Sequence, residues 1–522
     1  MQNRLNITEY CLNKHAQEMP NQSALIIVDK IGEARSFSYG ELYKNVCQLT
    51  SGLRSLQLPK GTVVSIQAND AYDIVLFFLS AIAADLVPIT ILISISNDEL
   101  IYILHHSATK LFIQLSTNNT ICLPNGCQLM QVIDFNQLKK YPPDEINPTT
   151  LVNDPAFIFY TSGSAGKPKG VLHAQHTILG RLPSLIYWLT IKNFDLVMQT
   201  DNLCWTYSMF TGLLDPLLVG ATALIFNPVN QSSLAEDSIS GETWLELIDT
   251  YHVTIIASTP DIYNTILNAN NIIPRSLRMA GSAGAALSEI IQNRWQNKFH
   301  FPIYTALGMS ELSTFISTGE QFPYRKNTLG KIQPGRKVTL LPLEDGYNTV
   351  PDNTIGMLAI HKEELGFMLG YINEPQNQIS HYRGDWFLTQ DLVSKDEHGY
   401  IHYYGRADSI IKIDGGFRVS PIEIETVLKQ YDQLYDVACG AILDQQTNTY
   451  FLVAYIMSHT PSQSLADQIF QFLSQHLSDY KIPKYIYFVE SLPYNNRNKL
   501  MRHKLTELKP IFIFLNKKLQ DK

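Results

Sequence analysis

One loop of this chain reads Tyr160-Thr161-Ser162-Gly163-Ser164-Ala165-Gly166-Lys167-Pro168-Lys169-Gly170-Val171, and it directly follows the apolar, strand-like segment Ala156-Phe157-Ile158-Phe159. Hydroxyl and backbone N–H groups can donate hydrogen bonds to phosphate oxygens, glycines let the main chain approach closely, and lysines add positive charge. The P-loop of kinases and GTPases requires a Gly-Lys-Ser/Thr order, which Pro168 interrupts here. The loop is therefore predicted to bind a polyphosphate in a different way, with a glycine-rich surface turn as the alternative.

The composition indicates a globular enzyme rather than a nucleic-acid-binding or membrane protein. The chain has 522 residues, of which 45% are hydrophobic and 17% charged, which is typical of two or more soluble domains. Its net charge of −8 argues against nucleic acid as the main partner. The cysteines are scattered, no leader-like segment opens the chain, and the longest apolar stretch, 74–84, is about half of a membrane span. We expect a cytoplasmic protein with no integral membrane association.

Strand-like runs alternate with helical stretches, which predicts an α/β protein with largely parallel, buried sheets. The strand-like runs include 62–66, 110–113, 221–225 and 253–256, and the helical stretches include 72–84 and 288–299. In the smaller part that follows a turn and short strand at 398–408, Ser420 is predicted to cap a helix with Pro421 at its first position. We expect an N-terminal domain at residues 1–407 and an α+β domain at 408–522.

The opening loop resembles the signature loop of the adenylate-forming superfamily, which includes acyl- and aryl-CoA ligases, luciferases and the adenylation domains of peptide synthetases. Further segments resemble this family in the same order along the chain, at 280–287, 304–311, 384–391, 405–408 and 492–502. The resemblance implies a large N-terminal domain of mixed, mostly parallel sheets and helices, followed by a small mobile C-terminal domain. It also implies a reaction in which ATP and a carboxylic acid give acyl-AMP and pyrophosphate, before a thiol accepts the acyl group.

The resemblance implies that Lys499, Glu311 and Thr161 are catalytic and that Glu311 is the Mg²⁺ ligand. Asp391 would accept hydrogen bonds from the ribose hydroxyls, and Arg406 would contact the nucleotide. The predicted ATP- and AMP-binding residues are Thr161, Ser162, Gly163, Ser164, Gly166, Lys167, Lys169, Ser282, Ala283, Gly284, Leu307, Gly308, Met309, Ser310, Glu311, Asp391, Arg406 and Lys499. The alternative for Glu311, at the start of a helix, and for Lys499 is a solvated charge, and the alternative for Asp391 and Arg406 is a surface ion pair.

The C-terminal domain is predicted to take part in both half-reactions. Asp408 matches the family's hinge, and Lys499 matches the lysine whose ammonium bridges the acyl carboxylate and the α-phosphate. Gly415 and Gly416 resemble the loop that borders the pantetheine tunnel of CoA ligases. Coenzyme A is therefore the predicted co-substrate beside ATP and Mg²⁺, and a phosphopantetheinyl carrier protein is an open alternative. The oligomeric state is left open, with a homodimer as one option.

The predicted acyl pocket resembles that of benzoate-CoA ligases over 204–210 and 215–222. Its predicted residues are Trp205, Tyr207, Met209, Ala306 and Gly308. Amino-acid-activating relatives carry an aspartate where Trp205 and Thr206 stand here, so an aryl or medium-sized acyl acid is favoured over an amino acid. The alternative is that Trp205 and Tyr207 are core residues without a ligand.

Four positions depart from the family pattern. Ala165 replaces a threonine, Gln390 and Asn498 replace glycines, and Leu307 stands where many relatives carry a tyrosine that stacks on adenine. Losing one hydrogen bond to a phosphate costs about 1.5–3 kcal/mol, which would slow the reaction without abolishing it. A non-catalytic nucleotide-binding protein is therefore a further alternative.

Overall fold

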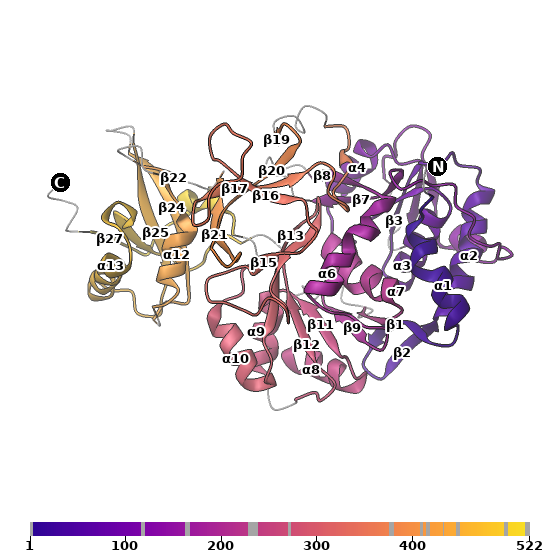
Figure 1. The fold of residues 1–522 in the computed structure, drawn as a ribbon, viewed down its shortest axis with the longest axis horizontal. Coiled ribbons are helices and arrows are strands. Elements are labelled where there is room, and N and C mark those ends of the chain that lie inside the picture. Colours follow the sequence, from indigo (N-terminus) through magenta and orange to yellow (C-terminus); the bar gives the residue numbers. More distant parts are fainter. Residues whose placement is uncertain are drawn as a thin grey trace. The chain divides into compact units, whose positions relative to one another are not determined.

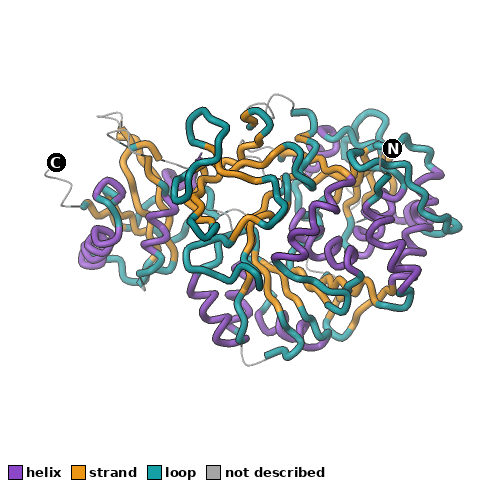
Figure 2. Tube along the Cα trace, in the orientation of Figure 1, coloured by secondary structure: helices purple, strands orange, loops and turns teal. Residues whose placement is uncertain are grey.

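The computed structural model describes residues 4–115, 121–161, 168–227, 239–269, 273–374, 381–407, 411–413, 418–431, 433–444, 449–494 and 500–516 (Figure 1). Helices alternate with strands through most of the chain (Figure 2), in agreement with the predicted α/β class. Within the described ranges, no helix combines the length and the apolar character needed to cross a bilayer.

The chain divides into two compact units. Unit 1 comprises residues 1–338 and 361–387, and unit 2 comprises residues 339–360 and 388–522. Residues 388–407 thus belong to unit 2, whereas the sequence analysis assigns them to the N-terminal domain. The boundary between 407 and 408 stays a prediction.

The first sheet of unit 1 is parallel in its interior and antiparallel at both edges. Parallel strands need crossover connections, and helices such as α8 (Gly241–Thr250) and α9 (Pro260–Asn268) supply them. The strand order is β15 (Lys331–Ile332), β14 (Ser313–Ser317), β13 (Ile303–Met309), β12 (Met279–Ser282), β11 (Ile255–Ser258), β9 (Leu196–Gln199), β10 (Thr222–Phe226), β1 (Ser23–Lys30) and β2 (Glu33–Ser38).

The second sheet of unit 1 carries the predicted phosphate loop at one end. Its strand order is β18 (Gly370–Tyr371), β8 (Lys169–Ala174), β7 (Pro155–Thr161), β4 (Val87–Thr90), β3 (Val63–Gln67), β5 (Leu111–Gln114) and β6 (Gln128–Met130). The pairs from β7 to β6 are parallel, and β8 is antiparallel to both β7 and β18. The two-residue strand β18 therefore lies beside the strand that follows the phosphate loop.

The largest core of unit 1 joins residues of both sheets with residues of several helices. These helices include α1 (Ile7–Glu18), α2 (Tyr39–Ser55) and α3 (Ala71–Ala83). Helix α3 is buried along most of its length, which explains the long apolar stretch of the sequence without a membrane. Fully burying one such aliphatic side chain contributes about 1.5–3 kcal/mol. The same core includes Phe157 and Phe159 of β7, the strand that leads into the predicted phosphate loop.

Four strands of a five-stranded sheet lie mainly in unit 2, namely β16 (Val338–Leu341), β17 (Gly356–His361), β20 (Trp386–Lys395) and β21 (Ile401–Arg406). The short pair β22 (Ile411–Lys412) and β23 (Arg418–Val419) follows. The C-terminal sheet has the order β24 (Asp436–Asp444), β25 (Thr449–Met457), β26 (Tyr485–Phe488) and β27 (Phe512–Leu515). Helices α12 (Pro421–Leu428) and α13 (Gln463–His476) share a core with that sheet.

Most predicted elements are confirmed. Strands β3, β5 and β10 overlap their predicted runs, whereas β11 begins two residues later than the run 253–256. The reason is that Val253 still donates its N–H to the Ile248 carbonyl at the end of α8. The predicted cap is also confirmed, because Ser420 accepts from the Glu423 N–H and Pro421 opens α12.

Candidate active site

The predicted phosphate loop connects β7 to β8, and its two ends are paired. Thr161 lies opposite Lys169 in the antiparallel register. The Lys169 ammonium lies 3.7 Å from the Glu374 carboxylate and 5.0 Å from the centre of the Tyr371 ring. Loop residues 162–167 lie outside the described ranges, and they include the predicted contacts Ser162, Gly163, Ser164, Gly166 and Lys167.

Glu311 lies in the turn between β13 and β14, and no helix begins there. Its carboxylate accepts a hydrogen bond from the Tyr371 hydroxyl at 2.5 Å, and its carbonyl accepts from the Met368 N–H at 2.8 Å. Burial and the Glu311 carboxylate both raise the pKa of Tyr371, which keeps the phenol protonated as a donor. A partly exposed carboxylate is therefore held at a turn within unit 1.

The backbone before Glu311 is fixed by a buried histidine. His173 Nε2 donates to the Ser310 carbonyl at 2.8 Å, while His173 Nδ1 faces the Thr177 hydroxyl at 3.4 Å. Burial lowers the pKa of His173 to about 4, so the ring is neutral at neutral pH. The Ser310 hydroxyl also lies 3.3 Å from that of Thr206, which belongs to the predicted acyl segment.

The backbone after Glu311 is held by a buried ion pair. Ser313 has a φ of 74°, which is rare for a residue with a side chain. Its hydroxyl accepts a hydrogen bond from Arg181, whose guanidinium also makes two hydrogen bonds to Asp215, at 2.9 and 2.6 Å. The Arg181 and Asp215 side chains are 1% and 2% exposed, so the pair is shielded from solvent.

The predicted adenine loop begins at the end of β12. Ser282 pairs with Thr305 of β13, and the Ser282 hydroxyl is buried without a hydrogen-bond partner among the described residues. Gly284 has a φ of 87°, a conformation that glycine adopts without strain. Because β13 continues into the Glu311 turn, the structure places Leu307, Gly308, Met309 and Ser310 on the strand and turn next to this loop.

The predicted acyl-pocket residues do not all share one environment. Tyr207 and Ala306 pack against one apolar cluster that also contains Trp188 and Ala283. Met209 instead lies fully buried in the core of helices α1, α2 and α3. Residues 208–214 form a π-helix, a rare geometry that often occurs at functional sites. The assignment of Trp205, Tyr207, Met209, Ala306 and Gly308 to an acyl pocket stays a prediction.

In unit 2, Asp391 of β20 lies directly opposite Arg406 of β21. One Asp391 carboxylate oxygen accepts from the Tyr403 hydroxyl at 3.1 Å and lies 3.9 Å from the Arg406 guanidinium. The Asp391 N–H donates to the Thr389 hydroxyl, and Arg406 donates to the Thr389 carbonyl. Two of the predicted nucleotide-binding residues of this unit, Asp391 and Arg406, are therefore neighbours.

The predicted hinge residue Asp408, the predicted pantetheine-loop residues Gly415 and Gly416, and the predicted catalytic Lys499 lie outside the described residues. Described neighbours frame the segment that contains Lys499. Tyr494 pairs with Leu500 in an antiparallel bridge, and the Met501 N–H donates to the Pro493 carbonyl at 2.7 Å.

The donor set at Glu311 fits a magnesium ion that is held mainly by phosphates. Magnesium commonly binds through one or two carboxylates together with substrate phosphates and water. Within the described parts of the chain, no cluster of three or more His, Cys, Asp or Glu side chains could hold a metal by itself. A single carboxylate such as Glu311 thus fits a metal that arrives with a nucleotide.

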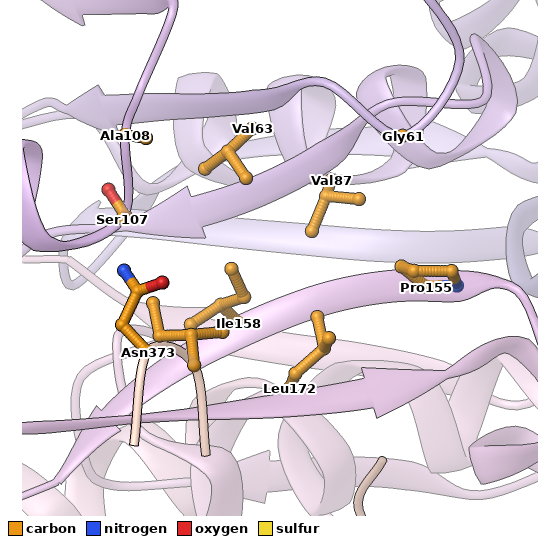
Figure 3. A pocket seen from close by; sticks show the side chains of 10 residues that line it. Gly61, Val63, Val87, Ser107, Ala108, Pro155, Ile158, Leu172 and Asn373 are labelled. Atoms are coloured by element: carbon orange, nitrogen blue, oxygen red, sulfur yellow. The ribbon is translucent and has the colours of Figure 1, made fainter. Parts of the chain in front are cut away.

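A separate apolar recess of about 190 Å³ lies on the second sheet of unit 1. Figure 3 shows its walls, which include Val63, Val87, Ile158 and Leu172, with Ser107 and Asn373 on one side. Its lining includes no charged side chain and no predicted site residue, so it does not suit a nucleotide.

Three side chains near the predicted residues were not identified from the sequence. They are His173, Tyr371 and Tyr403, and each contacts a residue of a predicted motif. Each contacts its motif from a distant part of the chain or from a neighbouring strand, and motif spacing in a single sequence does not reveal such contacts. Tyr371 could have been identified only from the pairing of its strand with the strand that begins at Lys169.

Comparison with known proteins places the chain in one family. The model of the AMP-binding enzyme family matches residues 12–372. The chain is 27% identical to a benzoate–CoA ligase of Thauera aromatica, over 91% of each sequence, and 26% identical to an uncharacterized acyl–CoA ligase, YtcI, of Bacillus subtilis (strain 168), over 93% of this chain and 92% of that protein.

Solved structures confirm the predicted fold. A benzoate CoA ligase from Burkholderia xenovorans LB400 has a TM-score of 0.81 at 24% identity, over 96% of this chain and 100% of that chain. The anthranilate CoA ligase AuaEII, solved with anthranoyl-AMP, has a TM-score of 0.83 at 23% identity, over 97% of each chain. With a family model that matches well over half of its residues, this chain belongs to the AMP-binding enzyme family.

Proposed function

We propose that this chain is an AMP-forming acid–thiol ligase, which uses ATP to convert a carboxylic acid to acyl-AMP and then transfers the acyl group to coenzyme A. The observation that carries this proposal is the family match over 12–372, which includes both the phosphate loop and the Glu311 turn. The named CoA ligases that resemble the chain over nine-tenths of its length support the same reaction.

In the proposed first step, the acid's carboxylate attacks the α-phosphate and pyrophosphate leaves, so no protein nucleophile is required. Thr161 and Lys169 would bind phosphate oxygens, and Asp391 would hold the ribose hydroxyls. Glu311 would hold Mg²⁺, which when bound neutralises charge on the triphosphate. Lys499 would contact both the acyl carboxylate and the α-phosphate, where negative charge moves during the reaction.

The proposed substrate is an aryl or medium-sized acyl acid. Tyr207 and Ala306 adjoin an apolar cluster, which suits an uncharged ring or chain better than a second charge. Burial keeps the pKa of Tyr207 well above its usual value, so this phenol is neutral and offers no charge to an ammonium group. The benzoate–CoA ligase of Thauera aromatica among the relatives supports the aryl option.

Coenzyme A is the proposed acceptor because the relatives named above are CoA ligases. Within this proposal, Asp408 keeps its predicted role as hinge between residues 1–407 and 408–522, and Gly415 and Gly416 keep theirs beside the pantetheine arm. A cytoplasmic location and a homodimer remain predictions.

Acid-dependent pyrophosphate release, measured with ATP, Mg²⁺ and a panel of aryl and acyl acids, tests the first step. We expect release with at least one aryl or medium-sized acid and a loss of about 100-fold or more in Glu311→Gln, as mutations at transition-state-stabilising groups produce. Retained ATP binding without release for any acid would instead support a non-catalytic protein. Thioester formation with coenzyme A, compared with a phosphopantetheinylated carrier protein, tests the acceptor.

A further inference from the structure

The Tyr371 hydroxyl contacts the end of the Glu311 side chain. The phenol donates to one carboxylate oxygen at 2.5 Å, across 60 positions of sequence. Tyr371 is 7% exposed, so solvent has little access to compete for this hydrogen bond. A short hydrogen bond to a carboxylate in a shielded position restricts the directions in which that carboxylate can point.

The backbone that carries Glu311 is fixed on both sides. His173 holds the Ser310 carbonyl, the Met368 N–H holds the Glu311 carbonyl, and Arg181 holds the Ser313 hydroxyl. With the main chain held at these points, the remaining freedom of the carboxylate lies in the torsions of its own side chain. The hydrogen bond from Tyr371 restricts these side-chain torsions.

The position of Tyr371 is itself fixed by the strand that follows the phosphate loop. Tyr371 lies opposite Val171 in the β18–β8 pair, and the Ile372 N–H donates to the Gly170 carbonyl at 2.9 Å. The Lys169 ammonium lies 5.0 Å from the centre of the Tyr371 ring. One aromatic side chain therefore contacts both a predicted phosphate-binding lysine and the predicted magnesium ligand.

We propose that Tyr371 is a positioning residue, which aims the Glu311 carboxylate at a magnesium ion bound with ATP. This inference rests on the proposed function, because Glu311 is assigned to the metal there. Tyr371 touches neither the acid nor the reacting atoms in this assignment. It acts through Glu311 and holds that carboxylate in a fixed position relative to Lys169, which lies on the strand beside that of Tyr371.

The test is the Mg²⁺ dependence of ATP binding, measured by calorimetry without any acid so that no turnover occurs. Tyr371→Phe removes one oxygen atom and keeps the ring beside Lys169. We expect the Mg²⁺ concentration at half-saturation to rise about tenfold, which corresponds to about 1.4 kcal/mol. An unchanged or lower half-saturation concentration in Tyr371→Phe would overturn the proposal.

A double variant shows whether Tyr371 acts through Glu311. In a Glu311→Ala background, the Phe substitution should change the half-saturation concentration by less than about twofold, because alanine no longer offers an acceptor to the Tyr371 hydroxyl. A persistent tenfold shift in that background would mean that Tyr371 acts by another route, and it too would overturn the proposal.

Tyr39→Phe is the matched control for losing a buried phenol hydroxyl. Tyr39 is fully buried and donates to the Ala221 carbonyl at 2.6 Å, so its loss affects stability without reaching Glu311. Its Mg²⁺ titration should match that of the wild type, and a shift equal to that of Tyr371→Phe would count against the proposal.

Acid-dependent pyrophosphate release by the wild type separates the proposed ligase function from the positioning role of Tyr371. Its absence would overturn the proposed function, whereas normal release with an unaltered Tyr371→Phe titration would overturn only the positioning role.

Discussion

Gln390 has a φ of 69°, in the left-handed region that favours glycine, and it stands where the family pattern has a glycine. The left-handed conformation costs a side-chain-bearing residue about 1–2 kcal/mol, while glycine loses about 0.4–1 kcal/mol more backbone entropy on folding. We expect Gln390→Gly to stabilise unit 2 by about 0.5–1 kcal/mol. Scanning calorimetry of the two proteins measures the difference.

The same substitution in a helix provides the control. Gln471 is an exposed residue of α13, where glycine is unfavourable. Gln471→Gly should destabilise the protein by about 1 kcal/mol. Destabilisation of similar size at both positions would show that the backbone at Gln390 carries no strain.

The buried His173 makes the stability of unit 1 depend on pH. Its folded pKa of about 4 lies below the ordinary value of 6.5, so the unfolded chain binds the extra proton between these pH values. The stabilisation that comes from this lowered pKa is fully present above pH 6.5 and is lost as the pH falls toward 4. The total loss in the free energy of unfolding is about 3 kcal/mol. His173→Gln, which cannot titrate, should lose less stability over this range in urea unfolding followed by fluorescence. Equal losses in both proteins would contradict this role of His173.

Lys499 is predicted to act in the first half-reaction alone. Lys499→Ala should reduce acyl-AMP formation strongly, because the ammonium no longer offsets the charge that moves to the α-phosphate. Thioester formation from supplied acyl-AMP should stay close to that of the wild type. Rapid-quench measurement of each half-reaction makes the comparison, and equal losses in both would argue against the assigned role.

At the scale of the element, the Arg181–Asp215 pair joins the turn η1 (Gln175–Arg181) to α7 (Asp215–Val219) and, through Ser313, to β14. Removing one member of a buried pair leaves the other charge unpaired, at a cost of about 3–5 kcal/mol. We expect Asp215→Ala to destabilise unit 1 by this amount. Tryptophan fluorescence during urea unfolding reports this unit, because all the tryptophans lie in it.

An exposed pair supplies the comparison. Lys337 and Glu363 are 52% and 65% exposed and lie 3.2 Å apart. Glu363→Ala should cost less than about 1 kcal/mol, since water and ions screen such a pair. A similar loss in both variants would mean that burial of the Arg181–Asp215 pair contributes nothing.

Elements with a clear periodicity could be predicted from the sequence, and contacts across strands could not. The apolar pattern and the Asp70 cap specify α3, and Ser420 with Pro421 specifies the start of α12. Strand β18 has only two residues, which is too short for any pattern, and it carries Tyr371. Its pairing with β8 depends on the tertiary fold.

For the candidate site as well, the motifs could be predicted from the sequence and the contacts between them could not. Motif order predicted that Glu311, Asp391 and Arg406 are functional, and the structure adds the register that places Asp391 opposite Arg406. No pattern in the sequence indicates that Met209 is in the main core while Tyr207 adjoins a different cluster. Both lie in the segment 204–210, and which face each one occupies depends on the π-helical backbone there.

At the scale of the whole molecule, the predicted C-terminal domain can be tested as a separate chain. The two clusters that form its core contain only residues from 411 onward. Residues 408–522 alone should therefore unfold cooperatively, as seen by circular dichroism and dispersed amide NMR signals.

The contacts of β21 favour the opposite outcome, in which residues 408–522 do not fold alone. The Ser420 hydroxyl donates to the Tyr404 carbonyl, so residues before 408 also support α12. If 408–522 folds only together with 339–360 and 388–407, unit 2 is the folding unit and the predicted boundary is wrong.

The division of the chain into interleaved units also sets an order of events on the ribosome. Residues 339–360, which belong to unit 2, are synthesised before residues 361–387, which complete unit 1. Strand β17 must then wait for its neighbour β20 to emerge, and its unpaired edge is open to wrong partners during that time. At about 5–20 residues per second, this delay lasts seconds, during which a nascent-chain chaperone could protect the open edge of β17.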